Sequence, residues 1–342
     1  GSIPFDIFSA SFYLLSRYEE YLPHEKDQYG RYAHTNSTAY QYQFMDLPLI
    51  DLWMQQLELI LKQQRASWHL PIRIFTIQPS YDIDEAYRYI WQSPFRNIRG
   101  YFVDLLQGKF QNVTNRMNVL AGKQKDPYDI YDWLDQLHEQ YHLDPIYFFL
   151  LAEKRTSIDK NIDPYTKGMQ QLLRKHAEKY TFGIHPSVQS SGNDDIVKRE
   201  CQLLTYHTNK QIDRSRQHYL MMGMPDTYRS LIALGIRHDY SMGYGTVNGF
   251  RASVARPFYW YDLQNERVTS LLIHPFCYMD STAIFYERLN VEMAFERMNT
   301  FYETVKKVHG QFSIVLHNHF LAEQPEWMMW RQLYEDFLAM HC

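Results

Sequence analysis

The sequence predicts an α/β protein in which about seven parallel strands form a distorted, closed or nearly closed (β/α) barrel, preceded by a small, mostly helical N-terminal segment. Two observations lead to this fold class. Short apolar runs bounded by turn residues recur along the second part of the chain, and amphipathic stretches with helical spacing separate them. Alternating strands and helices are typical of a parallel sheet, and seven such units come close to the number that closes a barrel. The 342 residues and 45% hydrophobic content are enough for a full core.

The first part of the chain differs in pattern from the rest. Residues 3 to about 65 are rich in tyrosine and carry helical periodicity, with a clear amphipathic stretch at 49–61. Residues 67–71 have the character of a connection, after which the strand-like runs begin. We therefore expect an N-terminal helical segment over residues 1–68 and the barrel over residues 69–342. Because Gly1–Ser2 resembles residues left by cloning, we expect the segment to be the tail of a truncated domain.

The barrel elements are assigned from the same two periodicities. The predicted helices each carry one apolar face and lie at 127–142, 165–179 and 289–308. The predicted strands are short and apolar, and they lie at 72–78, 145–151, 180–185, 211–216, 234–240, 269–274 and 312–317.

Composition excludes several classes of partner. The formal charge of -4 leaves no excess of Lys or Arg for a phosphate backbone, so we expect no nucleic-acid binding. No run of eighteen or more apolar residues is present, so we expect no integral membrane segment. The lone cysteines Cys201, Cys277 and Cys342 have no disulfide or zinc-knuckle spacing and favour a reducing compartment. We expect a cytoplasmic location and leave export open, since the N-terminus has the look of a truncated one.

Polar side chains follow the predicted strands at their carboxyl ends. Asp82 and Asp84 come soon after the first run, and the later strands end in further polar groups: His185, Arg216 and His218, Asp239, and His317. In a parallel barrel these ends meet at one face. Carboxylates and imidazoles gathered with an arginine are what a metal-assisted hydrolase needs.

Five motifs in order carry a family resemblance. The five are 183–187, 215–220, 239–244, 249–251 and 317–318, and they resemble one branch of the polysaccharide deacetylases of the NodB-homology type, carbohydrate esterase family 4. The segment 79–84, which precedes them, also resembles this family. The resemblance covers roughly residues 70–320 and is closest to a branch common in Bacteroidetes that carries an N-terminal extension. It implies that the barrel is the catalytic domain of a hydrolase that removes an acetyl group, mainly N-acetyl, from a sugar of a bacterial polysaccharide or its precursor. The implied cofactor is a divalent metal, usually zinc, and the implied partner is an N-acetylated oligo- or polysaccharide.

The resemblance also implies roles for single residues. Asp84 and His185 match metal ligands, and Asp82 matches the general base. The chain departs from the family where Gln189 stands in place of the second histidine, and a neutral amide is a poor zinc ligand. We therefore expect His218 to be the third ligand, with a packed histidine as the open alternative.

The remaining motif positions complete the expected site. Arg216 matches the arginine that orients the base, although a structural ion pair would look the same in the sequence, and His317 matches the general acid. The neighbouring Asn318 and His319 could be the exposed residues instead. Asp239 is expected to hold the second nitrogen of a histidine. A loop bearing Tyr244, Arg251 and Trp260 is expected to face the sugar, with a place in the core as the equal alternative.

Two other functions stay open on sequence grounds. The missing second histidine and the 28 tyrosines fit a catalytically inactive carbohydrate-binding relic of the same fold. A metal amidohydrolase acting on a different amide is also compatible, because fold and metal ligands do not fix the substrate. Sugar identity, linkage and oligomeric state are not encoded in any motif found.

Overall fold

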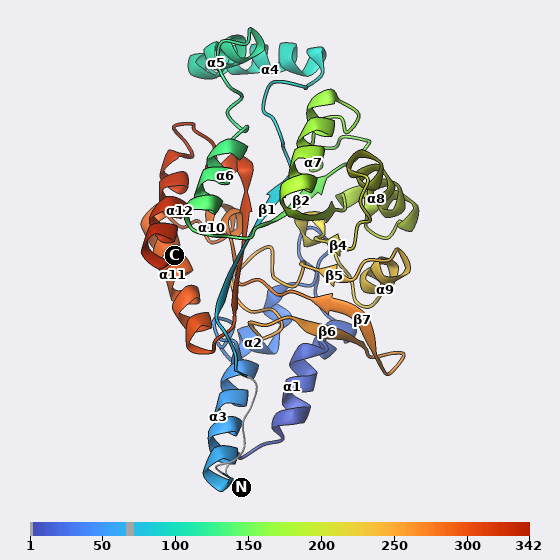
Figure 1. The fold of residues 1–342 in the computed structure, drawn as a ribbon. Coiled ribbons are helices and arrows are strands. Elements are labelled where there is room, and N and C mark those ends of the chain that lie inside the picture. Colours follow the sequence, from blue (N-terminus) through green and yellow to red (C-terminus); the bar gives the residue numbers. More distant parts are fainter. Residues whose placement is uncertain (1–2, 66–71) are drawn as a thin grey trace.

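The computed structural model describes residues 3–65 and 72–342 and shows an α/β fold built on one central sheet (Figure 1). Nine strands form this sheet, rather than the expected seven, in the order β6-β7-β5-β4-β3-β2-β1-β9-β8. All neighbouring strands are parallel except β6 and β7. Among the described residues β6 and β8 end the sheet without pairing with each other, so the sheet is open and the closed seven-stranded barrel is not what forms.

The strands agree with the prediction in the centre of the sheet and differ from it elsewhere. The first strand begins later than expected, at Thr76, because its neighbour supplies no partner before Gln311. It then continues through Ile83, so that Asp82 lies inside the strand. The bounds are β1 Thr76–Ile83, β2 Ile146–Leu150, β3 Thr181–His185, β4 Arg214–Ser215, β5 His238–Asp239, β6 Phe258–Asp262, β7 Arg267–Ile273, β8 Tyr278–Met279 and β9 Gln311–His317.

Two strands were not predicted, for different reasons. β6 carries aromatic residues that we interpreted as a substrate loop, and it pairs antiparallel with β7. β8 is only two residues long, too short for a period of two to be visible in the sequence. Both are edge strands, where pairing depends on one neighbour only.

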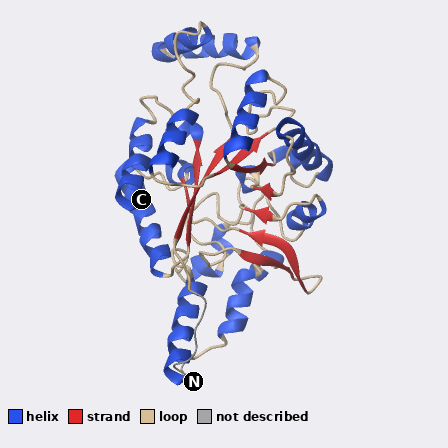
Figure 2. Cartoon of the chain, viewed as in Figure 1, coloured by secondary structure: helices blue, strands red, loops and turns tan. Residues whose placement is uncertain are grey.

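Helices and strands alternate along the chain, as the sequence predicted, and the helices surround the curved sheet (Figure 2). They pack against its outer face, whereas the inner face curves onto itself, so that the ring of Phe148 on β2 lies 5.2 Å from the ring of Tyr240, which follows β5. The three expected helices are confirmed as α6 Tyr131–Gln140, α7 Lys167–Lys179 and α11 Val291–Lys307. Side chains at the N-caps fix where α7 and α11 begin, since Thr166 and Asn290 each accept a hydrogen bond from the backbone N–H three residues later. The other helices of this part are α4 Pro94–Leu106, α5 Phe110–Leu120, α8 Asp194–Thr208, α9 Asp226–Ala233, α10 Asp280–Phe285 and α12 Met328–His341.

The N-terminal segment is largely helical, with α1 Ile7–Leu15, α2 Thr38–Gln41 and α3 Leu49–Gln64. Leu14 and Ile50 belong to the same hydrophobic core as the sheet, and the segment is joined to it by buried ion pairs. The Glu20 carboxylate lies 2.6 Å from Arg251 and 2.7 Å from Arg17, with all three side chains buried. The connection expected at 67–71 and the boundary at residue 68 lie outside the described residues.

The central strands are buried on both faces, and their residues on the outer face are apolar. Tyr81, Phe149 and Ile314 are fully buried beneath the helices. Among the described helices, none combines the length and apolar character needed to cross a bilayer.

Candidate active site

A cavity of about 550 Å³ opens at the carboxyl ends of the central strands. The strand register brings its polar residues together: Asp82 on β1 lies opposite His317 on β9, and His185 ends β3. Asp84 directly follows β1, and His218 lies in a single turn after β4. All five line the cavity, so the strand-end residues of the sequence meet at one place.

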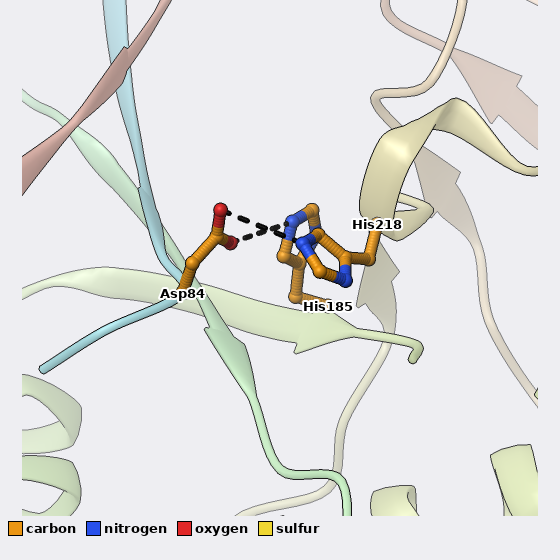
Figure 3. Close-up of side chains that lie close together, drawn as sticks. All are labelled: Asp84, His185 and His218. Atoms are coloured by element: carbon orange, nitrogen blue, oxygen red, sulfur yellow. Dashed lines mark ion pairs between the residues drawn. The ribbon is translucent and has the colours of Figure 1, made fainter. Parts of the chain in front are cut away.

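Three of these side chains point toward one another (Figure 3). One ligand atom from each of Asp84, His185 and His218 lies within 4.8 Å of the others. His185 Nε2 is 3.3 Å from Asp84 Oδ1, and His218 Nε2 is 3.5 Å from Asp84 Oδ2. The expected third ligand is therefore at the place that the sequence assigned to it.

The hydrogen bonds around the two imidazoles leave their Nε2 atoms available. His185 Nδ1 contacts the carbonyl oxygen of Arg216, and His218 Nδ1 lies 2.9 Å from Asp159 Oδ1. Both partners only accept, so each Nδ1 carries its hydrogen and each Nε2 turns a lone pair toward Asp84. Asp84 Oδ1 is itself buried with no hydrogen-bond partner among the described residues. A carboxylate and two imidazole lone pairs at these distances require a positive charge between them, which fits a divalent metal with nitrogen and oxygen ligands.

The pKa shifts of His218 and Asp84 also favour a positive charge at this place. Burial lowers the pKa of His218, but the carboxylates of Asp84 and Asp159 outweigh burial and raise it to about 9. Burial likewise opposes ionisation of Asp84, yet His218, His185 and His317 hold its pKa well below the ordinary value. Without a metal, a proton on His218 Nε2 supplies this positive charge; a bound cation would take the place of that proton and use the nitrogen's lone pair.

Asp159 is a supporting residue that sequence reasoning missed. Its Oδ1 accepts from His218, and its Oδ2 accepts from the side-chain amide of Gln189 over 3.1 Å. Gln189, which stands where the family pattern has a histidine, therefore holds the partner of His218 in place. Asp159 lies in the loop after β2, nine residues from the strand end, and no motif marked it.

Asp82 is held by Arg216 through one of its two carboxylate oxygens. Arg216 Nη1 donates to Asp82 Oδ1 over 2.8 Å, and its Nη2 donates to Ser80 Oγ over 2.8 Å. The free carboxylate oxygen, Oδ2, lies 3.6 Å from His185 Nε2. Both side chains are buried, and the guanidinium fixes the direction of this carboxylate.

His317 is held by a second carboxylate that sequence reasoning missed. Its Nδ1 lies 2.6 Å from Asp280 Oδ1, and its backbone N–H donates to Asp280 Oδ2 over 2.7 Å. Despite burial, Asp280 and Asp84 raise the pKa of His317 to about 9, so it carries a proton on the nitrogen that faces the cavity. Asp280 follows the two-residue strand β8, whose shortness hid it in the sequence.

The residues next to His317 differ in position. His319 also lines the cavity, while burial and the charge of His317 lower its pKa to about 3. Asn318 is buried and donates its amide to the carbonyl oxygens of Glu85 and Tyr128. Of His317 and His319, His317 is thus the one that carries a proton at the cavity wall.

Four expected site residues lie elsewhere. Asp239 does not hold a histidine, because its carboxylate accepts from the hydroxyls of Ser215 and Ser241 and from the backbone N–H of Ser241. Tyr244 and Arg251 are buried against the N-terminal segment, where Arg17 donates to the Tyr244 hydroxyl. Trp260 lies on β6 itself, with its side chain buried in the core. None of these four lines the cavity, so the core alternative holds for the aromatic loop.

The cavity wall instead includes residues from the N-terminal segment. Gln28, Tyr29 and Arg31 line it, and Arg31 Nη1 donates to the carbonyl oxygen of Tyr219 over 2.6 Å. The Tyr29 and Tyr219 rings meet edge to face with centroids 5.2 Å apart. Further aromatic side chains complete the wall: Tyr128, Phe285, Tyr286, Phe320 and Trp327.

Comparison with known proteins gives one family match and several structural similarities. Residues 1–66 match the model of a family of unknown function, DUF7033. No curated protein matches the sequence. The fold is similar to a presumed polysaccharide deacetylase from Mycobacterium smegmatis, with 12% identity, a TM-score of 0.48, and coverage of 80% of this chain and 87% of that one.

Two Bacillus proteins are also similar in structure. A polysaccharide deacetylase from Bacillus cereus has 11% identity and a TM-score of 0.38, over 78% of this chain and 88% of that one. A CE4 family pseudoenzyme from Bacillus anthracis has 7% identity and a TM-score of 0.37, over 77% of this chain and 62% of that one.

Proposed function

We propose that this protein is a metal-dependent deacetylase that hydrolyses an acetyl group, mainly N-acetyl, on a sugar of a bacterial polysaccharide or its precursor. One observation carries the proposal. The cavity joins a metal-competent group, Asp84–His185–His218, to an oriented carboxylate and a protonated histidine, each with its own buried partner. The deacetylase motifs of the sequence supply the same residues, which supports the assignment of the reaction.

Asp84, His185 and His218 would hold the metal, and two imidazoles with one carboxylate favour zinc. A bound divalent metal would supply Lewis acidity, which polarises a carbonyl and makes water more acidic. The remaining steps depend on the chain's own residues.

Asp82 would accept the proton of the attacking water at Oδ2. Its other oxygen is engaged by Arg216, so the carboxylate has one free face, and that face turns toward the ligand group. A base whose direction is already fixed needs no reorganisation when the proton arrives. Arg216 is thus a positioning residue that acts through Asp82.

His317 would donate the proton to the leaving nitrogen of the amide. An amine is a poor leaving group unless it is protonated as the bond breaks. The raised pKa of His317 keeps the proton available at neutral pH, and Asp280 fixes the ring so that Nε2 faces the cavity.

The cavity itself suits a sugar. Its volume lies within the range of small-molecule sites, and aromatic side chains offer flat faces for sugar rings. We propose that residues 69–342 form the catalytic domain and that residues 1–68 are an accessory segment, supported by the family match over residues 1–66. Since Tyr29 and Arg31 line the cavity, the segment would contribute to substrate binding.

Acetate release tests the proposal directly. The purified protein, with and without added zinc, is incubated with short N-acetylated and O-acetylated oligosaccharides, and free acetate is measured. We expect acetate from the N-acetylated substrate, its loss after chelation, and its return with zinc. Asp82→Asn and His317→Gln are expected to lower kcat at least a hundredfold, within the usual contribution of general acid–base groups.

Matched substitutions outside the cavity serve as controls. Asp144→Asn and His142→Gln change the same residue types at exposed positions and are expected to keep the parent kcat. Metal binding without acetate release from any acetylated sugar would contradict a deacetylase and favour a different amide substrate. Carbohydrate binding with neither metal nor acetate release would favour the non-catalytic relic.

A further inference from the structure

The α4–α5 hairpin presents its apolar side to solvent. On α4 the apolar residues recur with helical spacing at Phe95, Ile98, Phe102, Leu105 and Leu106, and they form one face. This face points outward: Phe95 is 75% exposed and Leu106 is 86% exposed. A surface helix normally turns its apolar face to the core, so the orientation of α4 is the reverse of the usual one.

The polar side of α4 is the side that packs. Asn97 is buried, and its amide donates to the carbonyl oxygen of Tyr89. Arg116 of α5 donates to Asn97 and, over 2.7 Å, to Asp104. These contacts fix the orientation, so the apolar face cannot turn inward without breaking an ion pair and a buried hydrogen bond.

The second helix extends the same kind of surface. Phe110, Met117 and Leu120 of α5 are each at least half exposed. Figure 1 shows the two helices side by side, standing clear of the sheet at the end of the molecule where β1 leads toward α4. Contiguous exposed apolar residues on a projecting element mark an interaction surface.

The charge of this element is opposite to that of the whole chain. Residues 94–125 contain six Lys or Arg and one Asp, whereas the chain as a whole has a formal charge of -4. Arg99, Lys109 and Lys123 are exposed and have no ion-pair partner within the described residues. The hairpin therefore presents exposed Phe and Leu side chains with positively charged side chains around them. Such a surface complements a partner that has an anionic surface above an apolar interior.

We propose that the α4–α5 hairpin docks on the surface of an anionic lipid bilayer. Amphipathic helices of this composition lie in the interface, with aromatic and aliphatic side chains among the acyl chains and Lys or Arg at the headgroups. A protein partner would not require the positive charge to be concentrated on this element. The charge complementarity therefore selects a membrane surface over a second copy of this negatively charged chain.

Docking would bring the active site close to the bilayer. A cavity of about 420 Å³ lies between the hairpin and the catalytic cavity, and four arginines line it: Arg88, Arg96, Arg99 and Arg116. Glu85 and Tyr128 line both cavities, so the two cavities are adjacent. The inference stands on the hairpin alone and does not depend on the deacetylase proposal.

Vesicle sedimentation tests the inference with the whole chain. The protein is mixed with vesicles of phosphatidylethanolamine and phosphatidylglycerol, or of phosphatidylcholine alone, at low and high salt. We expect binding to the anionic vesicles at least tenfold tighter than to the neutral ones, and weaker at high salt. Phe102→Ser with Leu106→Ser, and separately Arg99→Glu with Lys109→Glu, are each expected to weaken it at least tenfold.

The controls change residues on other helices that are also exposed. Leu59→Ser with Met293→Ser matches the apolar pair, and Lys167→Glu with Lys198→Glu matches the charge reversal; both are expected to bind like the parent. Circular dichroism melts establish that all variants fold. Acetate release from a short oligosaccharide is expected to be unchanged in the hairpin variants, so failure of docking and failure of the proposed reaction give different results.

Two outcomes would overturn the inference. Parent protein that stays in the supernatant with anionic vesicles excludes membrane docking. Equal loss of binding in the control variants shows that general charge or hydrophobicity, not the hairpin, drives sedimentation. Concentration-dependent dimerisation that Phe102→Ser with Leu106→Ser abolishes, without vesicle binding, would assign the face to a second copy instead.

Discussion

The guanidinium of Arg216 donates to the carboxylate of Asp82 over 2.8 Å, with both side chains almost fully buried. Three different donors of Arg216 are used: Nη1 on Asp82, Nη2 on Ser80 Oγ and Nε on the carbonyl oxygen of Tyr240. The guanidinium also lies over the Phe148 ring at 4.5 Å. The planar guanidinium is thus held by three acceptors and one aromatic ring. Its fixed position in turn fixes the orientation of the Asp82 carboxylate.

Two substitutions of Arg216 should therefore distinguish the effect of its positive charge from the effect of its hydrogen-bond geometry. Arg216→Lys keeps the charge but cannot reach three acceptors, so we expect kcat for acetate release to fall more than tenfold with zinc content unchanged. Arg216→Ala leaves Asp82 unpaired in a buried site and is expected to lower the free energy of unfolding by about 3–5 kcal/mol. Elemental analysis, steady-state kinetics and urea unfolding give the three readouts. Parent kcat in Arg216→Lys would mean that the pair is structural only.

Removing the partner of His218 should weaken metal binding. Asp159→Asn is expected to lower zinc affinity by about 10–100-fold, because the carboxylate that orients the imidazole and raises its basicity is lost. Competition with a chromophoric chelator measures the affinity. Asp239→Asn is the matched control, since Asp239 is equally buried but is bonded to Ser215 and Ser241 and does not line the cavity. Equal zinc affinity in Asp159→Asn and the parent would remove His218 from the ligand set.

Asp280→Asn should affect the reaction and leave the metal in place. An amide cannot supply the negative charge that raises the pKa of His317, so less of the histidine is protonated and its ring is held less firmly. We expect kcat to fall about tenfold or more, with zinc affinity within a factor of two of the parent. The alkaline limb of the kcat profile is expected to move to lower pH. An unshifted profile would rule out His317 as the acid.

The buried Glu20 should make stability depend on acid pH. Burial disfavours its charge, but Arg251 and Arg17 outweigh burial and lower its pKa to about 2, below the ordinary value of 4.5. A lowered acid pKa stabilises the folded state fully above the unfolded pKa, and this stabilisation is lost as the pH falls from about 4.5 through about 2. At 1.36 kcal/mol per pKa unit the contribution at neutral pH is roughly 3 kcal/mol.

Urea unfolding of the parent and Glu20→Gln between pH 7 and pH 3 measures this contribution. We expect the difference in free energy of unfolding to be largest near neutral pH and to shrink below pH 4.5. Glu178→Gln, at an exposed position without an ion pair among the described residues, should show no such trend. A pH-independent difference would mean that the Glu20 effect is packing, not charge.

The sequence by itself determined the alternation of strands and helices, because side-chain periodicity is local and survives in any tertiary context. It also identified Asp82, Asp84, His185, His218, Arg216 and His317, since each follows or ends an apolar run or sits in a motif. The expectation that they meet was right because the carboxyl ends of parallel strands share one edge of the sheet.

Only the tertiary structure decided which side chains support these six and which fill the core. Asp159 and Asp280 lie 59 and 37 residues from the histidines that they hold, and no local signal encodes a contact across such a separation. The choice between loop and core for Tyr244, Arg251 and Trp260 depended on what covers them. Glu20 and Arg17 cover the first two, and Trp260 packs into the core from β6, against Tyr228. Burial and pairing are set by neighbours in space, and a sequence shows only neighbours along the chain.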